Sequence, residues 1–238
     1  MVFYIFRFLL QSYKMLCMHI QNRLYLIDIT ELEDEKIFER WYSRMPAYRR
    51  DKIDSFKPAR SKLLSLGAGI LLDSAMNDTG IADYEISEGS KGKPYVKGRD
   101  DVFFNISHSG EWAALAVSDR EVGIDIQKVN VFKESLINHV FSEEEQQLAQ
   151  ENGSTDMFYT RMWTMKEAVM KHSGLGISLE AKNIALKFSN GRFRPVCTEY
   201  DSGGLIISEY ELEGYAISVC SSYDFSEQIK QPGHIHPG

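Results

Sequence analysis

Trp163-Thr164-Met165-Lys166-Glu167-Ala168-Val169-Met170-Lys171 lies within a run, from about Asp156 to His172, that contains neither proline nor glycine. Apolar residues recur in this run at helical spacing. Asp156 can cap its start, and Ser173-Gly174 can end it. The pattern therefore predicts a helix that packs one apolar face against the core.

The predicted helix also carries a polar face. Trp163, Glu167 and Lys171 are four residues apart and therefore share one side of it. The simplest interpretation is an amphipathic helix with an exposed ion pair between Glu167 and Lys171, a common arrangement that stabilises little. A second acidic motif upstream, at Asp125, favours a functional interpretation instead.

The composition is that of an ordinary globular protein. The 238 residues are 43% hydrophobic and 26% charged, and the length allows one large domain or two of about 110 residues. A formal net charge of −7 argues against a nucleic-acid partner, because nucleic-acid-binding proteins normally carry net positive charge. It leaves room for a local basic pocket that binds an anionic small molecule.

The cysteines and the N-terminus bear on location. Cys17, Cys197 and Cys220 are odd in number and have neither zinc-ligand nor redox spacing, which favours a reducing, cytoplasmic compartment. The first ten residues are apolar but too short to span a membrane, and Arg7 interrupts them. We expect no membrane association and treat residues 1–20 as an N-terminal extension.

The first half of the chain alternates strands and helices. Strands are predicted at 23–29, 102–107, 112–117 and 122–127, and the short turns between neighbouring strands favour antiparallel pairing. Thr30 and Glu33 form a capping-box pattern for a helix that Pro46 ends. A long apolar helix follows at 60–72, and its small residues Gly67, Ala68 and Gly69 indicate close packing.

The second half repeats this plan. Ser142 and Glu145 form another capping box, and the Trp163 helix follows. Strands are predicted at 183–188 and 193–197 around an Asn190-Gly191 hairpin turn, then at 205–210 and 215–220. The pattern suggests a duplicated α+β unit with halves at 21–122 and 123–225, and we expect residues 226–238 to be a disordered tail.

Asp125 lies in an apolar strand between Ile124 and Ile126. A carboxylate there is costly to bury unless it is paired or binds a cation, although an edge-strand aspartate facing water is an equally simple interpretation. If Asp125 and Glu167 meet, the two carboxylates form a site suited to Mg²⁺, completed by water and a substrate phosphate. Neighbouring lysines would then hold the phosphate.

Four short motifs carry a family resemblance. In chain order they are Gly92-Lys93-Pro94, Asn105-Ile106-Ser107-His108-Ser109-Gly110, Gly123-Ile124-Asp125-Ile126 and Trp163-Thr164-Met165-Lys166-Glu167-Ala168. Together they resemble the signatures of the 4′-phosphopantetheinyl transferases, in particular the surfactin-synthetase type with its Trp-x-x-Lys-Glu-Ala motif. Each motif alone is weak, but four in order from about residue 23 to 222 form a specific pattern.

The resemblance implies an activity and a fold. Family members transfer the phosphopantetheine arm of coenzyme A to a serine of an apo acyl, peptidyl or aryl carrier protein and release 3′,5′-ADP with the help of Mg²⁺. Their fold is a pseudo-dimer of two α+β halves with coenzyme A in the cleft between them, which agrees with the repeated plan. Duplicated members act as monomers, so we expect a monomer.

The resemblance also assigns roles near the phosphates. Asp125 and Glu167 match magnesium ligands, and Glu167, or a metal-bound water beside it, would help remove the serine proton. Glu145 matches another acidic position given that role, with capping of its own helix as the alternative. Lys166 and Lys171 match phosphate-contacting lysines, and Lys171 would stabilise or protonate the leaving phosphate.

Further positions match nucleotide contacts. Ser107 and His108 match residues that hold the phosphates of the nucleotide. Lys93 and Pro94 match the loop on the adenine side, where an ordinary turn is the alternative.

Three assignments are looser. Arg49 and Lys52 fall near the basic contacts to the 3′-phosphate, with a solvated charge run as the alternative. Gln127 stands where many relatives have a third carboxylate, so it would contact the metal directly or through water.

The leading hypothesis is therefore a magnesium-dependent transferase that activates carrier proteins. The rival hypotheses are a non-catalytic module that binds coenzyme A or carrier proteins and a magnesium-dependent hydrolase of the pyrophosphate. Nothing in the sequence selects among fatty-acid, polyketide and nonribosomal-peptide carriers.

Overall fold

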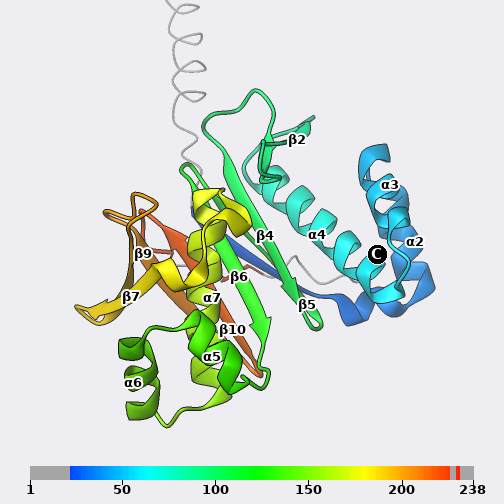
Figure 1. The fold of residues 1–238 in the computed structure, drawn as a ribbon. Coiled ribbons are helices and arrows are strands. Elements are labelled where there is room, and N and C mark those ends of the chain that lie inside the picture. Colours follow the sequence, from blue (N-terminus) through cyan, green and yellow to red (C-terminus); the bar gives the residue numbers. More distant parts are fainter. Residues whose placement is uncertain (1–21, 226–228, 231–238) are drawn as a thin grey trace, which may run out of the picture.

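The computed structural model describes residues 22–225 and 229–230. The protein is an α+β fold with two main sheets, as the sequence predicts (Figure 1). The expected extension at 1–20, and Cys17 with it, lies outside the described residues. Within the described ranges no helix has the length and apolarity needed to cross a membrane.

The first sheet has the strand order β11-β1-β5-β4. Its strands are β1 (Arg23–Asp28), β4 (Phe103–Ser109), β5 (Trp112–Ser118) and β11 (Ile229–Lys230). The pairs β1–β5 and β5–β4 are antiparallel, whereas β11 lies parallel to β1. The prediction of a disordered tail from 226 onward is therefore wrong for residues 229–230, which complete this sheet.

The long helix α4 (Ala59–Asp78) covers the first sheet, and its glycines allow close contact with the elements around it. A Cβ on Gly67 would lie 2.9 Å from Ile29 Cγ2, and one on Gly69 would lie 2.8 Å from Met45 Sδ. Real Cβ atoms hardly ever approach this closely, so the predicted close packing of the small residues is confirmed.

Shorter elements surround α4. They are the 3₁₀ helix η1 (Ile29–Glu33), α2 (Glu35–Arg44), α3 (Ala47–Ser55) and the hairpin of β2 (Ile86–Glu88) and β3 (Pro94–Val96). The predicted Thr30–Glu33 capping box does not form. Asp28 caps η1 instead, and the Asp34 side chain accepts hydrogen bonds from the first N–H groups of α2, because two successive short helices require two caps.

The second sheet has the order β6-β10-β9 and is covered by α7 (Asp156–Ser173). Its strands are β6 (Val122–Lys128), β9 (Ile206–Leu212) and β10 (Tyr215–Ser221). A Cβ on Gly123 of β6 would overlap the backbone of Ala168 and His172, so α7 rests directly on this strand. The predicted helix is confirmed, although Thr155 rather than Asp156 provides its cap.

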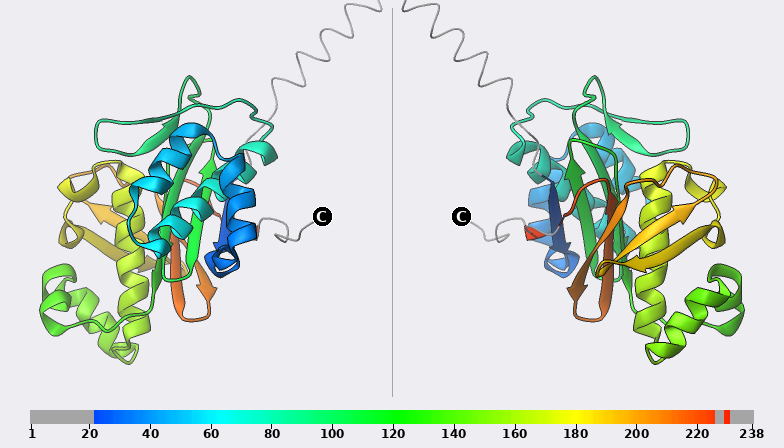
Figure 2. Two further views of the ribbon diagram at one scale, coloured as in Figure 1. Left: turned by 90° about the vertical axis from the view of Figure 1, so that its right-hand side faces the viewer. Right: turned by 90° about the vertical axis from the view of Figure 1, so that its left-hand side faces the viewer.

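The remaining elements extend the second sheet outward. They are α5 (Glu134–Val140), α6 (Glu143–Glu151), η2 (Gly176–Ser178), η3 (Ala181–Asn183), β7 (Ile184–Ser189) and β8 (Arg192–Cys197). Figure 2 shows α5 and α6 at the side of the molecule opposite α2 and α3. The predicted hairpin between β7 and β8 is confirmed, with positive φ at both Asn190 and Gly191.

Side chains join the two sheets between β4 and β6. Three acceptors on β4 bind three backbone N–H groups on β6: Asn105 Oδ1 with Ile124 N (3.0 Å), Ser107 Oγ with Ile126 N (3.3 Å) and Ser109 Oγ with Lys128 N (3.0 Å). We call this contact the seam. Because alternate residues of a strand point to opposite faces, the intervening residues Phe104, Ile106 and His108 point away from the seam.

Candidate active site

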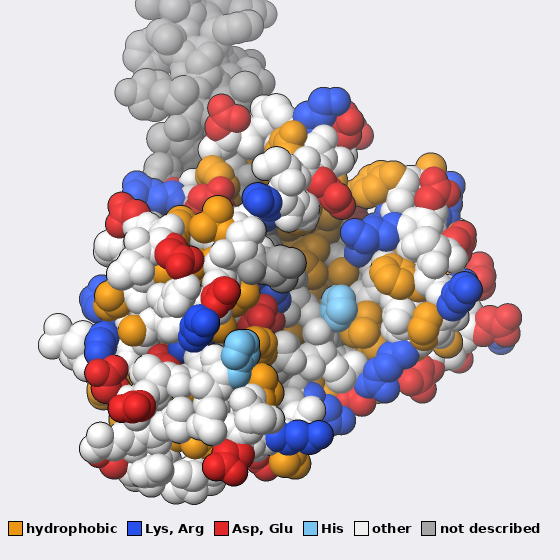
Figure 3. Space-filling view, in the orientation of Figure 1, with side chains coloured by type: hydrophobic (Ala, Val, Ile, Leu, Met, Phe, Trp, Pro, Cys, Tyr) orange, Lys and Arg blue, Asp and Glu red, His pale blue; other side chains and the backbone are white. Residues whose placement is uncertain are grey.

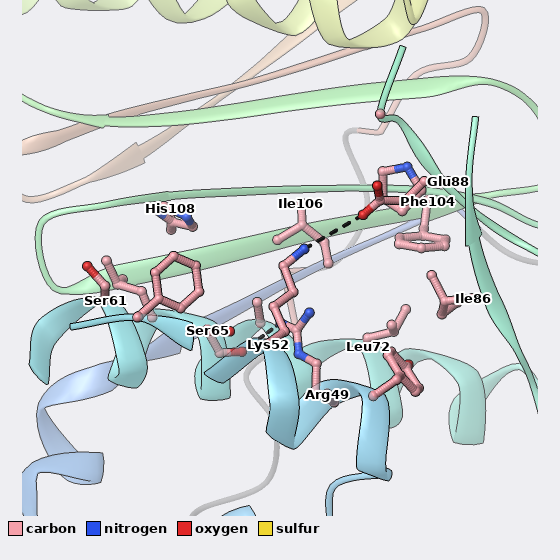
Figure 4. Close-up of a pocket in the computed structure, with 16 residues that line it drawn as sticks. Arg49, Lys52, Ser61, Ser65, Leu72, Ile86, Glu88, Phe104, Ile106 and His108 are labelled. Atoms are coloured by element: carbon pink, nitrogen blue, oxygen red, sulfur yellow. Dashed lines mark hydrogen bonds and ion pairs between the residues drawn. The ribbon is translucent and has the colours of Figure 1, made fainter. Parts of the chain in front are cut away.

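A cavity of about 350 Å³ lies on the side of β4 away from the seam. Its walls come from α3, α4, the β2–β3 hairpin and β4, and Figure 4 shows the side chains that line it. Figure 3 shows that the same face of the molecule is hollowed between its two lobes. Of the predicted site residues, Arg49, Lys52, Pro94 and His108 line this cavity.

Arg49 and Ser65 make the inner wall of the cavity polar. Arg49 is 9% exposed, and its Nη2 donates to the Ser65 carbonyl oxygen at 2.6 Å. Within the described residues, Arg49 Nε and Ser65 Oγ are buried without a hydrogen-bond partner. Burial lowers the pKa of Arg49, yet a guanidinium stays charged in proteins. A buried cation with a free N–H suits an anionic ligand.

The mouth of the cavity carries Lys52 and His108. Lys52 Nζ lies 3.9 Å from Glu88 Oε1 in an exposed pair (Figure 4). Desolvation lowers the pKa of His108, and the charge of Lys171 lowers it further, although the residue as a whole is exposed. His108 is thus electrostatically coupled to both Arg49 and Lys171.

Asp125 lies at the seam and is 1% exposed. Its Oδ1 accepts hydrogen bonds from Lys171 Nζ (2.6 Å) and Ser107 Oγ (2.7 Å), and Lys171 Nζ also lies 2.8 Å from Ser107 Oγ. Gln127 Nε2 donates to Oδ2 at 3.2 Å. Ser107 therefore faces the carboxylate rather than the cavity, as the alternation along β4 requires.

Glu167 completes the group from α7. Partial burial raises its pKa, the charge of Asp125 raises it further, and Lys171 partly offsets both. The helix pattern predicted a Glu167–Lys171 ion pair as its simplest interpretation, but Lys171 pairs with Asp125 instead. The fold thus brings together four residues from three of the sequence motifs: Asp125, Glu167, Lys171 and Ser107.

These residues fit a divalent cation. Two carboxylates that raise each other's energy by repulsion are stabilised when a cation lies between them. Within the described residues no group of three or more histidine, cysteine, aspartate or glutamate side chains forms a ready metal cage. An amide oxygen, water and substrate oxygens would have to complete the shell, which is the usual arrangement for Mg²⁺.

Lys166 and Glu145 lie outside this site. Lys166 is 0% exposed, and its Nζ donates to Glu145 Oε2 (2.7 Å), Val140 O (3.0 Å) and Ala181 O (3.1 Å). Desolvation lowers the pKa of Lys166, and Glu145 partly restores it. The assignments of Lys166 as a phosphate contact and Glu145 as a base are therefore wrong, because neither side chain reaches the cavity.

The alternative for Glu145 is confirmed, since Ser142 and Glu145 form the complete capping box of α6. The sequence held a signal for Lys166 as well. Lys166 follows Met162 by four residues and precedes Val169 by three, so it lies on the apolar face of the helix.

Other cavity residues were not predicted. Tyr48, Ser65, Phe104 and Glu88 all line the cavity. Phe104 could have been found, because it shares the strand alternation of His108. Ser65 and Glu88 reach the cavity through tertiary packing that no local pattern encodes.

Comparisons with known proteins identify the family. The family model for the 4′-phosphopantetheinyl transferase superfamily matches residues 121–220. A 4′-phosphopantetheinyl transferase of Bacillus subtilis is 31% identical over 67% of this chain and 70% of its own length. The transferase Sfp of Bacillus subtilis strain 168 is 29% identical over 80% and 88%, and AcpT of Escherichia coli O157:H7 is 32% identical over 60% and 68%. With that identity and coverage, the chain belongs to the 4′-phosphopantetheinyl transferase superfamily and is of the surfactin-synthetase type.

Proposed function

We propose that this protein transfers the 4′-phosphopantetheine arm of coenzyme A to a serine of an apo carrier protein. The serine oxygen forms a bond to the β-phosphorus of the pyrophosphate, the bond from that phosphorus to the bridging oxygen breaks, and 3′,5′-ADP leaves. The serine proton passes to a base. The observation that carries the proposal is the pairing of an anion-suited cavity with the Asp125–Glu167–Lys171 group across one strand, β4.

The cavity suits the nucleotide end of coenzyme A. Arg49 supplies a buried charge for the 3′-phosphate, with Lys52 and His108 at the mouth. Apolar side chains such as Phe104 and Pro94 offer a surface for the adenine. A volume of about 350 Å³ lies within the range of roughly 300–1,000 Å³ typical of ligand pockets.

Asp125 and Glu167 would hold Mg²⁺, with Gln127 contributing directly or through a water. When bound, the ion neutralises charge on the pyrophosphate. Glu167, or a metal-bound water beside it, would accept the serine proton. The Lys171 side chain is 28% exposed and pairs with Asp125, and its charge lowers the pKa of His108. Its ammonium would therefore stabilise the leaving phosphate.

The assignment of the cavity to coenzyme A and of the Asp125 group to catalysis favours two halves, 21–122 and 123–225, with the active site between them. The first half supplies β1, β4 and β5 under α4, and the second half supplies most of the sheet under α7; β11 pairs with β1 from beyond both ranges, and the seam joins the two sheets. We further infer a monomer in the cytoplasm that binds no nucleic acid or membrane. The free thiols of Cys197 and Cys220 agree with a reducing compartment.

The test is a transfer assay with several apo carrier proteins, coenzyme A and Mg²⁺, read by mass spectrometry of the carrier. We expect the carrier to gain the mass of the phosphopantetheine arm. Asp125→Asn and Glu167→Gln should abolish transfer, Lys171→Met should slow it by about 10² or more, and the exposed control Glu211→Gln should leave it unchanged.

No mass gain on any carrier would refute the proposal. Binding of coenzyme A by calorimetry, unaffected by Mg²⁺ and without turnover, would indicate a binding module instead. Release of 3′,5′-ADP without a carrier would indicate a hydrolase.

A further inference from the structure

Lys93 ties the β2–β3 hairpin to a distant part of the fold. It lies in the loop between the two strands, and its side chain is 19% exposed. The ammonium donates to Glu121 Oε2 (2.5 Å), the His172 carbonyl oxygen (3.1 Å) and the Val122 carbonyl oxygen (3.2 Å). Glu121 lies just before β6, Val122 is the first residue of β6, and His172 lies in the last turn of α7.

The three acceptors account for the whole ammonium group. A lysine has three N–H donors, and each of them has a protein partner here. The His172 carbonyl belongs to the C-terminal end of α7, where the helix dipole favours a positive charge. Lys93 therefore has no donor left for a ligand, which differs from the cofactor contact expected from its motif.

The hairpin itself depends on such outside contacts. Among the residues that the structure describes, β2 and β3 pair only with each other, as a separate two-stranded sheet. A two-stranded hairpin is marginally stable alone. Yet Ile86, Glu88, Gly92 and Pro94 of this segment line the cavity (Figure 4), so the position of the hairpin sets the shape of one cavity wall.

Few charged contacts other than that of Lys93 hold this wall. Lys52 and Glu88 approach to 3.9 Å as an exposed pair, and Lys97 pairs with Glu85 inside the hairpin segment itself. Exposed pairs of this kind contribute little to stability. The contact of Lys93 is less exposed and crosses from the hairpin to α7 and β6.

We propose that Lys93 is a positioning residue that latches the β2–β3 hairpin onto α7 and β6. Lys93 thereby holds the Pro94 wall of the cavity in the position that binds coenzyme A, without itself contacting the coenzyme. The inference rests on the proposed function for the identity of the ligand. The latch itself is a property of the ligand-free protein. Loss of the latch leaves the carboxylate group at the seam intact, so binding should suffer and the chemical step should not.

The test compares Lys93→Met with Lys97→Met, which removes the same charge from the same hairpin. Lys93→Met should raise the KM for coenzyme A by about tenfold, the value of one charge-assisted hydrogen bond, with kcat within about twofold. In the ligand-free protein, amide hydrogen exchange of residues 86–96 should accelerate by a similar factor. Lys97→Met should change neither quantity by more than about twofold.

Glu121→Gln separates a latch from a ligand contact. Glu121 is the charged partner of Lys93 and does not line the cavity. A latch predicts that Glu121→Gln raises both the KM and the hairpin exchange rate in the same direction as Lys93→Met. A rise in KM for Lys93→Met with unchanged exchange would show direct ligand contact and overturn the proposal, as would unchanged values of both.

A global fall in stability would appear as faster exchange throughout α7 and β6, and this too would overturn the proposal. Exchange in the ligand-free protein needs no turnover. If the wild-type protein modifies no carrier, the proposed function fails while the latch is still tested.

Discussion

Replacement of Lys166 by methionine should destabilise the protein strongly without altering the group at Asp125. Lys166 and Glu145 form an ion pair that is almost completely buried. Without the ammonium, the Glu145 carboxylate would stay buried next to an apolar side chain. The carbonyl oxygens of Val140 and Ala181 would each lose a donor as well.

The magnitude follows from the burial of both partners. Removal of one member of a buried ion pair typically costs about 3–5 kcal/mol, because the remaining charge is uncompensated. For a chain of this size each kcal/mol lowers the Tm by about 2–4 °C, so the fall should be roughly 6–20 °C. The double variant Lys166→Met/Glu145→Gln should recover much of this loss, since no buried charge remains.

Urea unfolding followed by tryptophan fluorescence and circular dichroism measures these differences. Lys97→Met, which breaks an exposed pair, is the matched control and should cost at most about 1 kcal/mol. A loss below about 1 kcal/mol for Lys166→Met, or a double variant no more stable than the single one, would refute the reasoning. At temperatures where Lys166→Met is folded, its transfer rate should stay near the wild-type rate, whereas a phosphate-binding lysine would lose about 10².

Three further changes test other contacts. Gly123→Ala should lower the free energy of unfolding by about 1–3 kcal/mol, because the added Cβ overlaps α7. The control Gly89→Ala, whose Cβ would have its nearest neighbour at 3.4 Å, should change this free energy by no more than about 0.5 kcal/mol. Equal urea midpoints for the two variants would contradict the close packing. Burial lowers the pKa of His172 to about 4 in the folded protein, below its unfolded value, so stability is full above pH 6.5 and should fall as the pH drops towards 4, by up to about 1.4 kcal/mol per pH unit. His172→Gln should lose this part of the pH dependence in unfolding curves, and an unchanged profile would count against the assignment. Saturating Mg²⁺ should raise the Tm of the wild-type protein but not that of Asp125→Asn, and an equal rise in both would exclude Asp125 as a ligand.

Local structure was largely predictable because its causes are local. Alternating apolar residues and the Asn190-Gly191 turn identified β7 and β8, and helical spacing identified α7. The return of residues 229–230 to β1 was not predictable, because two residues carry no periodic signal and the pairing joins the two ends of the described chain. The caps at Asp34 and Thr155 were missed because neighbouring residues offered equally good capping side chains.

The site likewise has features that local sequence patterns predict and features that depend on tertiary contacts. Strand alternation alone separates His108, which faces the cavity, from Ser107, which faces Asp125. The meeting of Asp125 with Lys171 joins β6 to α7, and only the family resemblance could suggest it in advance. The motif predicts a phosphate contact for Lys166, but this residue lies on the apolar face of α7, where three acceptors satisfy its ammonium.

The seam limits how the two sheets can move relative to each other. Its acceptors, Asn105, Ser107 and Ser109, recur every second residue and each binds one N–H group of β6. A slip of one residue would turn His108 into the seam and the serines out of it. Sliding could therefore occur only in two-residue steps of about 6.6 Å, with all three bonds broken in between. Shear motion along β4 is thus strongly opposed, and any opening of the molecule should proceed as a rotation about this line.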